Sequence, residues 1–242
     1  MIGEFLPRSA LDDGDVTAMH ALFTEHFDNV SERCFRTDLA RKDWVLRIRR
    51  NGVLLGFSSL QFLRVPHGAQ KLNVLCSGDT IVSPEARFST VLARTWIGAV
   101  RELGRYYAAT DLHWLLLVSG FRTYRFLPVF WRSFYPCHAE PTPPSVAEQM
   151  NHAARMAFGS QFAADEGVVR FTEPQICRAD RYGIDQRRLT DPHVRFFAER
   201  NPGYARGDEL VCWARLAPSN LTSAGTRILQ AHERDTRLPL AG

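Results

Sequence analysis

The stretch Leu72-Asn73-Val74-Leu75-Cys76-Ser77-Gly78-Asp79-Thr80-Ile81-Val82 decides which fold this chain can adopt. An apolar run over 72–76 stops at a polar segment, 77–80, and resumes at 81–82. Such a run predicts a buried strand. Glycine inside a strand is typical of a β-bulge, because it weakens a regular ladder. We therefore predict a bulged strand with its irregularity at Gly78.

The elements after this strand have the order of a crossover unit. Apolar residues recur at helical spacing over 91–103. A second apolar run, 115–118, leads into an aromatic segment, 121–134, that predicts another helix. Two parallel strands need a connection of this length, usually a helix. The sequence therefore predicts a parallel strand pair joined by a helix.

The elements before the strand predict a helix and an antiparallel hairpin. Residues 15–27 carry apolar side chains at helical spacing behind acidic residues, which suit a helix N-terminus. An alternating strand over 44–49 is followed by Asn51-Gly52, a hairpin-turn pair, and then by a second strand, 53–65.

This order resembles the GNAT (GCN5-related N-acetyltransferase) fold over roughly residues 10–136, in an atypical form. The resemblance implies an α+β fold with a mixed, mostly antiparallel central sheet, flanking helices and a C-terminal extension. It also implies that the bulged strand and the next helix hold acyl-CoA where the following strand splays away. The family's loop pattern, Arg/Gln-x-x-Gly-x-Gly/Ala, falls on 87–92. Arg87 matches, Thr90 and Leu92 replace the two glycines, and the usual catalytic tyrosine falls on Phe130.

A proline-rich break separates the last third of the chain. Three prolines lie within 136–145 beyond Pro136 itself, and such clusters punctuate domains. Residues 146–162 predict a helix and 209–214 a strand. We predict a GNAT-like acyltransferase core over 1–136 and a C-terminal extension over 137–242 that packs on it.

Composition excludes several classes of protein. The 242 residues contain no apolar run long enough to span a membrane and no basic-then-apolar leader, so we expect a cytoplasmic protein without a membrane partner. Five scattered cysteines show no metal-ligand or disulfide spacing, so we expect no metal site. The net charge of +4 is carried almost wholly by arginine, which suits phosphate recognition or reflects a GC-rich genome.

The polar residues at the bulge are the first candidates for chemistry. Forming an amide requires a base for the amine and donors that stabilise the oxyanion. Backbone N–H groups at Ser77, Gly78 and Asp79 could supply those donors and hold the acyl donor. Asp79 is our candidate base or ammonium-binding carboxylate, because a buried carboxylate has a raised pKa. The competing interpretation is a capping or turn aspartate. Tyr124 is the candidate general acid, and the competing interpretation is that its side chain is a structural anchor.

A second set of residues could bind the donor. Ser89 and Thr90 lie where the helix after the bulged strand begins, and helix N-terminal amides bind phosphate. They could equally be simple N-caps. The neighbouring arginines could add charge, and two more on the following helix could steer an anionic donor. The arginines concerned are Arg87, Arg94, Arg122 and Arg125.

Three functions are compatible with these residues. The first is an N-acyltransferase that moves an acyl group from acyl-CoA to the amine of a small molecule. The second keeps the fold but takes its acyl group from aminoacyl-tRNA, which the missing glycines and the arginines favour. The third is a GNAT-like binding module without catalysis. The sequence names neither the acceptor nor the oligomeric state.

Overall fold

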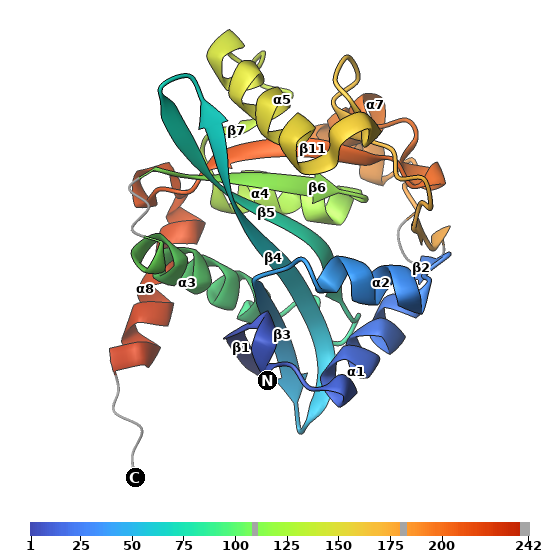
Figure 1. Ribbon diagram of the computed structural model, residues 1–242, viewed down its shortest axis with the longest axis vertical. Helices are drawn as coiled ribbons and strands as arrows, with labels where there is room; N and C mark the ends of the chain where they lie inside the picture. The colour runs from blue at the N-terminus through green and yellow to red at the C-terminus, as the bar shows by residue number, and fades with distance from the viewer. Residues whose placement is uncertain (108–110, 180–182, 238–242) are drawn as a thin grey trace.

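The computed structural model describes residues 1–107, 111–179 and 183–237 (Figure 1). In this part of the chain, a nine-stranded sheet has the order β1-β3-β4-β5-β6-β11-β9-β8, with β7 paired to β11, and β10 pairs with β2 in a second small sheet. The strands are β1 (Ile2–Pro7), β2 (Phe27–Asp28), β3 (Trp44–Arg50), β4 (Val53–His67), β5 (Gln70–Val82), β6 (Leu112–Val118), β7 (Phe134–Tyr135), β8 (Phe162–Ala163), β9 (Val168–Val169), β10 (Ile176–Cys177) and β11 (Glu209–Arg215).

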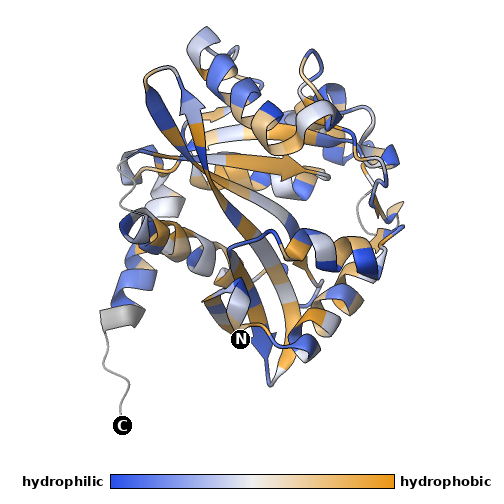
Figure 2. Ribbon diagram, viewed as in Figure 1, coloured by the Kyte–Doolittle hydropathy of each residue, from blue (hydrophilic) through white to orange (hydrophobic). Residues whose placement is uncertain are grey.

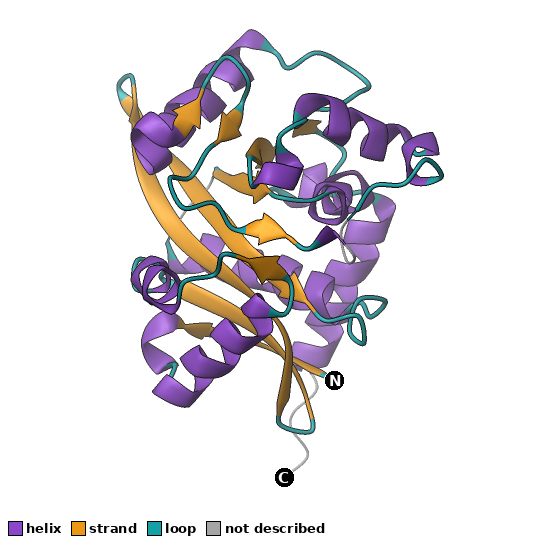
Figure 3. Ribbon diagram, turned by 90° about the vertical axis from the view of Figure 1, so that its right-hand side faces the viewer, coloured by secondary structure: helices purple, strands orange, loops and turns teal. Residues whose placement is uncertain are grey.

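Helices cover both faces of the sheet, and the long strands β4 and β5 cross between them (Figure 3). Side chains of α3, α4, α7 and α8 pack on one face. Those of α1, α2 and α5 pack on the other. The helices are α1 (Asp13–Thr24), α2 (Glu32–Leu39), α3 (Val91–Tyr106), α4 (Phe121–Phe130), α5 (Pro144–Phe158), α7 (Pro192–Arg200) and α8 (Ser223–Arg237).

The pairing pattern confirms the predicted fold class. The strand pairs of the main sheet are antiparallel, except that β5 and β6 run parallel with α3 as their crossover. This is the mixed, mostly antiparallel α+β architecture that the GNAT resemblance implies. Asn51 and Gly52 both have positive φ, as the predicted hairpin turn requires. The sequence analysis missed β1, which pairs with β3 at the sheet edge.

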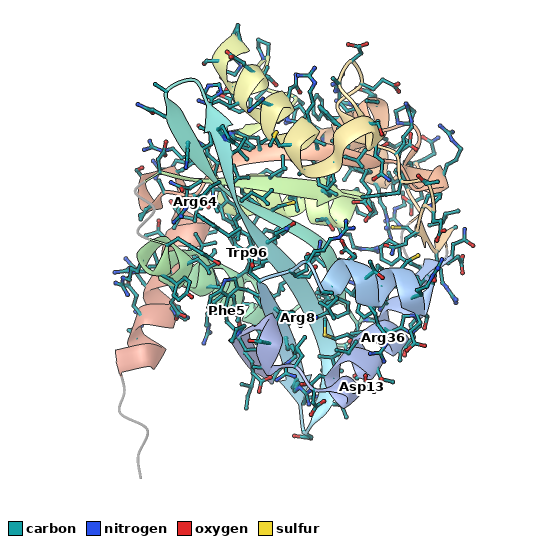
Figure 4. The ribbon with its side chains drawn as sticks, in the orientation of Figure 1. Phe5, Arg8, Asp13, Arg36, Arg64 and Trp96 are labelled. Atoms are coloured by element: carbon teal, nitrogen blue, oxygen red, sulfur yellow. The ribbon has the colours of Figure 1, made fainter. Side chains whose placement is uncertain are left out.

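Strand β6 lies in the core between the two helical layers. All seven residues of β6 are buried, and the strand is coloured almost entirely hydrophobic in Figure 2. On the α3 side, Trp96 of α3 packs against Trp114 of β6 with ring centroids 4.1 Å apart. Figure 4 labels Trp96 beside the sheet, and also shows Arg36 of α2 near Asp13, whose side chains form an ion pair at 2.7 Å.

The C-terminal third continues the main sheet. Residues 210–215 of β11 pair antiparallel with 113–118 of β6, so the sheet runs across the predicted boundary at residue 136. The predicted helix over 121–134 ends at Phe130, and 134–135 form β7 instead. Within the described ranges, none of the helices is long and apolar enough to cross a membrane.

Candidate active site

The site is built around a gap between β5 and β6. Their parallel pairing ends at Ser77 and Leu116, although β5 continues to Val82 and β6 to Val118. The two strands therefore separate where the polar segment begins, as the GNAT resemblance implied. Beyond Ser77 the β5 main chain has no β6 strand beside it, so its N–H groups on that side are placed to meet a ligand.

The predicted bulge is present, but the strained residue is Asp79. Phe57 pairs with Ile81 and Ser59 with Gly78, so one residue of β4 opposes Asp79 and Thr80. The φ of Asp79 is 44°, in the left-handed region, whereas Gly78 does not have positive φ. Aspartate tolerates this conformation better than most residues. Such strain is often found at functional sites.

Hydroxyl groups of β4 hold the bulge in place. Ser59 Oγ donates to Asp79 Oδ2 and to the Gly78 carbonyl oxygen, both at 3.3 Å. The hydroxyls of Ser58 and Thr80 lie 2.8 Å apart. The side chain of Asp79 is thus oriented by its neighbour on β4.

A cavity of about 270 Å³ opens on the α3 side of the gap. Its floor is Thr80 of β5 and Leu116 of β6, and its walls come from the loop before α3 and from α4. Four predicted donor-binding residues line it, namely Arg87, Ser89, Thr90 and Arg122. We call it the donor cavity.

The start of α3 leaves polar groups without side-chain partners. Thr90 occupies the N-cap position but forms no capping hydrogen bond, so the first-turn amides of α3 receive no side-chain acceptor from it. Arg87 Nη2 is shielded from solvent and has no hydrogen-bond partner among the residues that the structure describes. Ser89 instead donates its hydroxyl to the Ala86 carbonyl, 2.8 Å away. A bound anion would satisfy the Arg87 guanidinium and the helix terminus together.

Other predicted donor-binding residues have different roles. Trp114 Nε1 donates to Ser77 Oγ at 2.7 Å, which fixes that hydroxyl beneath the sheet. Arg125 is paired at 3.0 Å with Asp191, the N-cap residue of α7, and neither residue lines the donor cavity. Arg94 and Gly78 are not among the residues that line the donor cavity.

The surroundings of Tyr124 fit the structural anchor that the sequence analysis gave as its alternative. Its side chain is completely buried and is not among the residues that line the donor cavity. Its hydroxyl donates to the Pro136 carbonyl at 2.8 Å, and burial raises its pKa. Burial, a hydrogen bond to the main chain and a raised pKa are what an anchor of α4 in the core requires.

A second, much smaller cavity of about 20 Å³ lies on the other side of the gap. Thr80 and Thr123 line both cavities, so the two meet at the separated strands. We call the second one the acceptor cavity. Its lining comes from five distant parts of the chain: Phe23, Phe27, Asp79, Thr80, Leu117, Ser119, Thr123, Gln175 and Glu209.

Long-range pairing assembles the acceptor cavity. The β2–β10 pair sets Phe27 opposite Cys177, which brings Gln175 to this end of the sheet. The β11–β6 pair sets Leu210 opposite Val118, which places Glu209 at the open end of β6. The sequence analysis missed Glu209, because a lone acidic residue at the start of an apolar strand reads as a strand boundary.

Asp79 and Glu209 belong to a cluster with Asp38 and Lys42 of the α2 region. Burial raises the pKa of Asp79 to about 6, and the Lys42 ammonium opposes the shift while Asp38 adds to it. Burial and the charge of Asp79 raise the pKa of Glu209 to about 8. Lys42 Nζ lies 2.8 Å from Asp38 Oδ2, and these carboxylates keep the Lys42 pKa raised despite burial. Two carboxyl groups therefore titrate around neutral pH at one cavity.

In the described part of the chain, no group of three or more His, Cys, Asp or Glu side chains is arranged to hold a metal ion. All five cysteines are free, and burial raises the pKa of Cys76 to about 11.

Neither a protein-family model nor a curated protein sequence matches this chain. Solved structures with related folds include a conserved protein of unknown function from Enterococcus faecalis, with 12% identity over 55% of this chain and 33% of that one, at a TM-score of 0.43. An acyl-CoA N-acyltransferase from Pseudomonas aeruginosa has 20% identity over 47% of this chain and 77% of that one, at a TM-score of 0.35. N-myristoyltransferase from Saccharomyces cerevisiae has 13% identity over 48% of this chain and 31% of that one, at a TM-score of 0.36. The chain spans about a third of the length of the Enterococcus faecalis protein.

Proposed function

We propose that this chain is an N-acyltransferase that moves an acyl group from acyl-CoA to the amine of a small-molecule acceptor. The observation that carries this proposal is the pair of cavities that share Thr80 and Thr123 at the gap between β5 and β6. Two substrates could approach one point from opposite sides of the sheet, and their reacting atoms would meet beside Asp79. Such positioning accounts for a large share of catalysis in transfer reactions.

The donor cavity suits a long, narrow ligand that ends in phosphates. Aromatic and aliphatic side chains such as Trp96, Phe126 and Phe130 supply apolar walls for an acyl-pantetheine chain. Arg87 and the uncapped N-terminus of α3 supply a place for phosphate. Leu92 also lines the cavity, at the position of a family glycine, so a phosphate would contact the guanidinium more than the backbone.

The acceptor side supplies the base. Burial raises the pKa of both carboxyls, but the Lys42 ammonium counters the shift more at Asp79, to about 6, than at Glu209, to about 8, so Asp79 ionises before Glu209 as pH rises. The Asp79 carboxylate binds the ammonium group and accepts one proton from it, which it releases to solvent after turnover. The neutral amine attacks the thioester carbonyl, so a C–N bond forms and the C–S bond breaks. The second proton, which the nitrogen loses after attack, passes to the departing thiolate and gives the free thiol. β5 main-chain N–H groups beyond Ser77 stabilise the oxyanion.

The test measures turnover with several acyl-CoA donors, in the wild-type protein and in one variant of the proposed base. Purified protein is mixed with acetyl-CoA or longer acyl-CoAs and a panel of primary amines, and free thiol and amide product are both measured. We expect amide formation at the rate of thiol release. Asp79→Asn should reduce kcat/KM by roughly 10²–10⁴-fold, the usual contribution of a general base. Asparagine also tolerates positive φ, so the bulge should survive the change.

Two other outcomes would redirect the assignment. The same amines are offered with aminoacyl-tRNA in place of acyl-CoA. Amide formation from aminoacyl-tRNA alone, sensitive to salt, would overturn acyl-CoA as the donor while keeping the transferase. Saturable binding of amine or CoA with no transfer from either donor, and equal affinity in Asp79→Asn, would instead identify a binding module.

A further inference from the structure

The acceptor cavity has room for only one small group. Its volume of about 20 Å³ is close to what a single water-sized probe occupies. An –NH₃⁺ group has the size of a water molecule. A methyl or carboxylate substituent on the carbon that bears the nitrogen would need additional space beside the ammonium group, inside the same cavity.

The walls of the cavity resist widening. Phe23 and Leu117 are buried in two different packed clusters, on α1 and β6 respectively. Phe23 packs edge-on against Phe27, with ring centroids 5.0 Å apart. Close-packed side chains of this kind do not yield to one extra carbon without strain. Aromatic rings beside a cavity also favour a cation over a neutral group.

The charges around the cavity leave room for one more positive group. Asp79 and Glu209 line it, and Asp38 and Lys42 interact with both of them electrostatically. With Glu209 protonated, the carboxylates of Asp38 and Asp79 face the single ammonium of Lys42. An incoming ammonium would balance this excess of one negative charge, whereas an α-carboxylate on the acceptor would face the Asp79 carboxylate at close range.

We propose that the acceptor presents a primary amine on an unbranched carbon, –CH₂–NH₃⁺, and that α-branched amines and α-amino acids are excluded. This inference rests on the proposed function, because it assigns the acceptor cavity to the amine. It places the end of a lysine-like side chain, a polyamine or an aminomethyl group in the acceptor class, and the α-amino groups of free amino acids outside it.

Three amines with a common chain test the proposal. Hexylamine, heptan-2-amine and 2-aminoheptanoate share the same carbon chain, and the second and third add a methyl or a carboxylate to the carbon that bears nitrogen. We expect kcat/KM for hexylamine to exceed that for heptan-2-amine by about 10–200-fold, the discrimination that one excess carbon gives. 2-Aminoheptanoate should be used less well still. Equal use of all three would overturn the proposal.

Variants of β6 supply the matched control. Leu117→Val should widen the cavity and raise the relative use of heptan-2-amine several-fold. Leu115→Val changes a residue that is equally apolar and packs in the same cluster but does not line the cavity, so it should leave the preference unchanged. The same shift in both variants, or in neither, would overturn the proposal.

Calorimetric binding separates this inference from the proposed function. If hexylamine binds more tightly than heptan-2-amine but no donor supports transfer, the acceptor preference holds and the transferase assignment fails. If amides form from all three amines at similar rates, the transferase assignment holds and the preference fails.

Discussion

The two cavities differ in how the chain builds them. Apart from β6, the donor cavity comes from residues that follow one another closely, from Thr80 to Trp96 and from Arg122 to Phe130. The acceptor cavity combines α1, the bulge of β5, the end of β6, the segment before β10 and the first residue of β11. One is a local structure of the crossover unit, and the other exists only when the whole sheet has formed. Changes on the two sides should therefore affect different kinetic parameters.

After Asp79, the largest expected effect is at Glu209, the residue that only the folded sheet brings to the gap. Glu209→Gln keeps the shape of the side chain but removes the carboxyl group that can accept and donate a proton. If Glu209 assists Asp79, kcat should fall by roughly 10²-fold, at the low end for acid–base groups. The KM for the donor should stay the same, as measured by thiol release with varied acyl-CoA. A changed KM for the donor with an unchanged kcat would contradict this prediction, because it would mean that Glu209 acts in donor binding.

The next effect separates two arginines that sequence reasoning treated alike. Arg87→Ala should raise the donor KM by roughly 10–100-fold, because a hydrogen bond to a charged group contributes about 1.5–3 kcal/mol. Arg125→Ala is the matched control, since Arg125 is exposed and paired with Asp191. It should leave the donor KM within about twofold, as for a surface ion pair. Equal effects of the two variants on the donor KM would contradict the assignment of Arg87, and not Arg125, to the donor cavity.

A smaller effect concerns pH. Because Asp79 must be ionised to accept a proton, kcat/KM should rise with pH through about 6. The Lys42 ammonium lowers the pKa of both Asp79 and Glu209. Lys42→Met removes that cation, so the rising limb should move to higher pH, while Asp38 remains as a further negative charge. The pH profile of the variant measures this directly, and a shift to lower pH would contradict the assigned electrostatics.

The same contrast between local and long-range structure explains what the sequence could predict. The strand, bulge, crossover helix and second strand follow from periodicities within about fifty residues, and so does the donor cavity between them. Glu209 could not be found in this way, because its position depends on which strand β11 pairs with. The direction in which Tyr124 points could not be found in this way either, because neighbouring residues of one helix face different sides. Thr123, Phe126 and Phe130 line the donor cavity from one side of α4, whereas Tyr124 faces the core.

Burial of Glu209 should also make the fold less stable at alkaline pH. Its pKa in the folded protein is about 8, above the ordinary 4.5, so the folded state retains a proton that the unfolded state has lost. The stability from this proton is complete below pH 4.5 and is lost as pH rises through 8. Glu209→Gln should therefore raise Tm relative to the wild type at pH 9, by roughly 2–4 °C per kcal/mol. At pH 5 the two proteins should differ little.

The smallest effect on activity is expected at Tyr124, where the sequence suggested a catalytic acid. Tyr124→Phe removes only the hydroxyl that donates to the Pro136 carbonyl. Losing one buried hydrogen bond reduces stability by about 0.5–1.5 kcal/mol, which thermal unfolding should show as a lower Tm. The kcat of the variant should match that of the wild type, since the phenol reaches neither cavity. If kcat fell tenfold while the variant stayed fully folded, Tyr124 would have a catalytic role after all. That result would also mean that α4 moves when the donor binds.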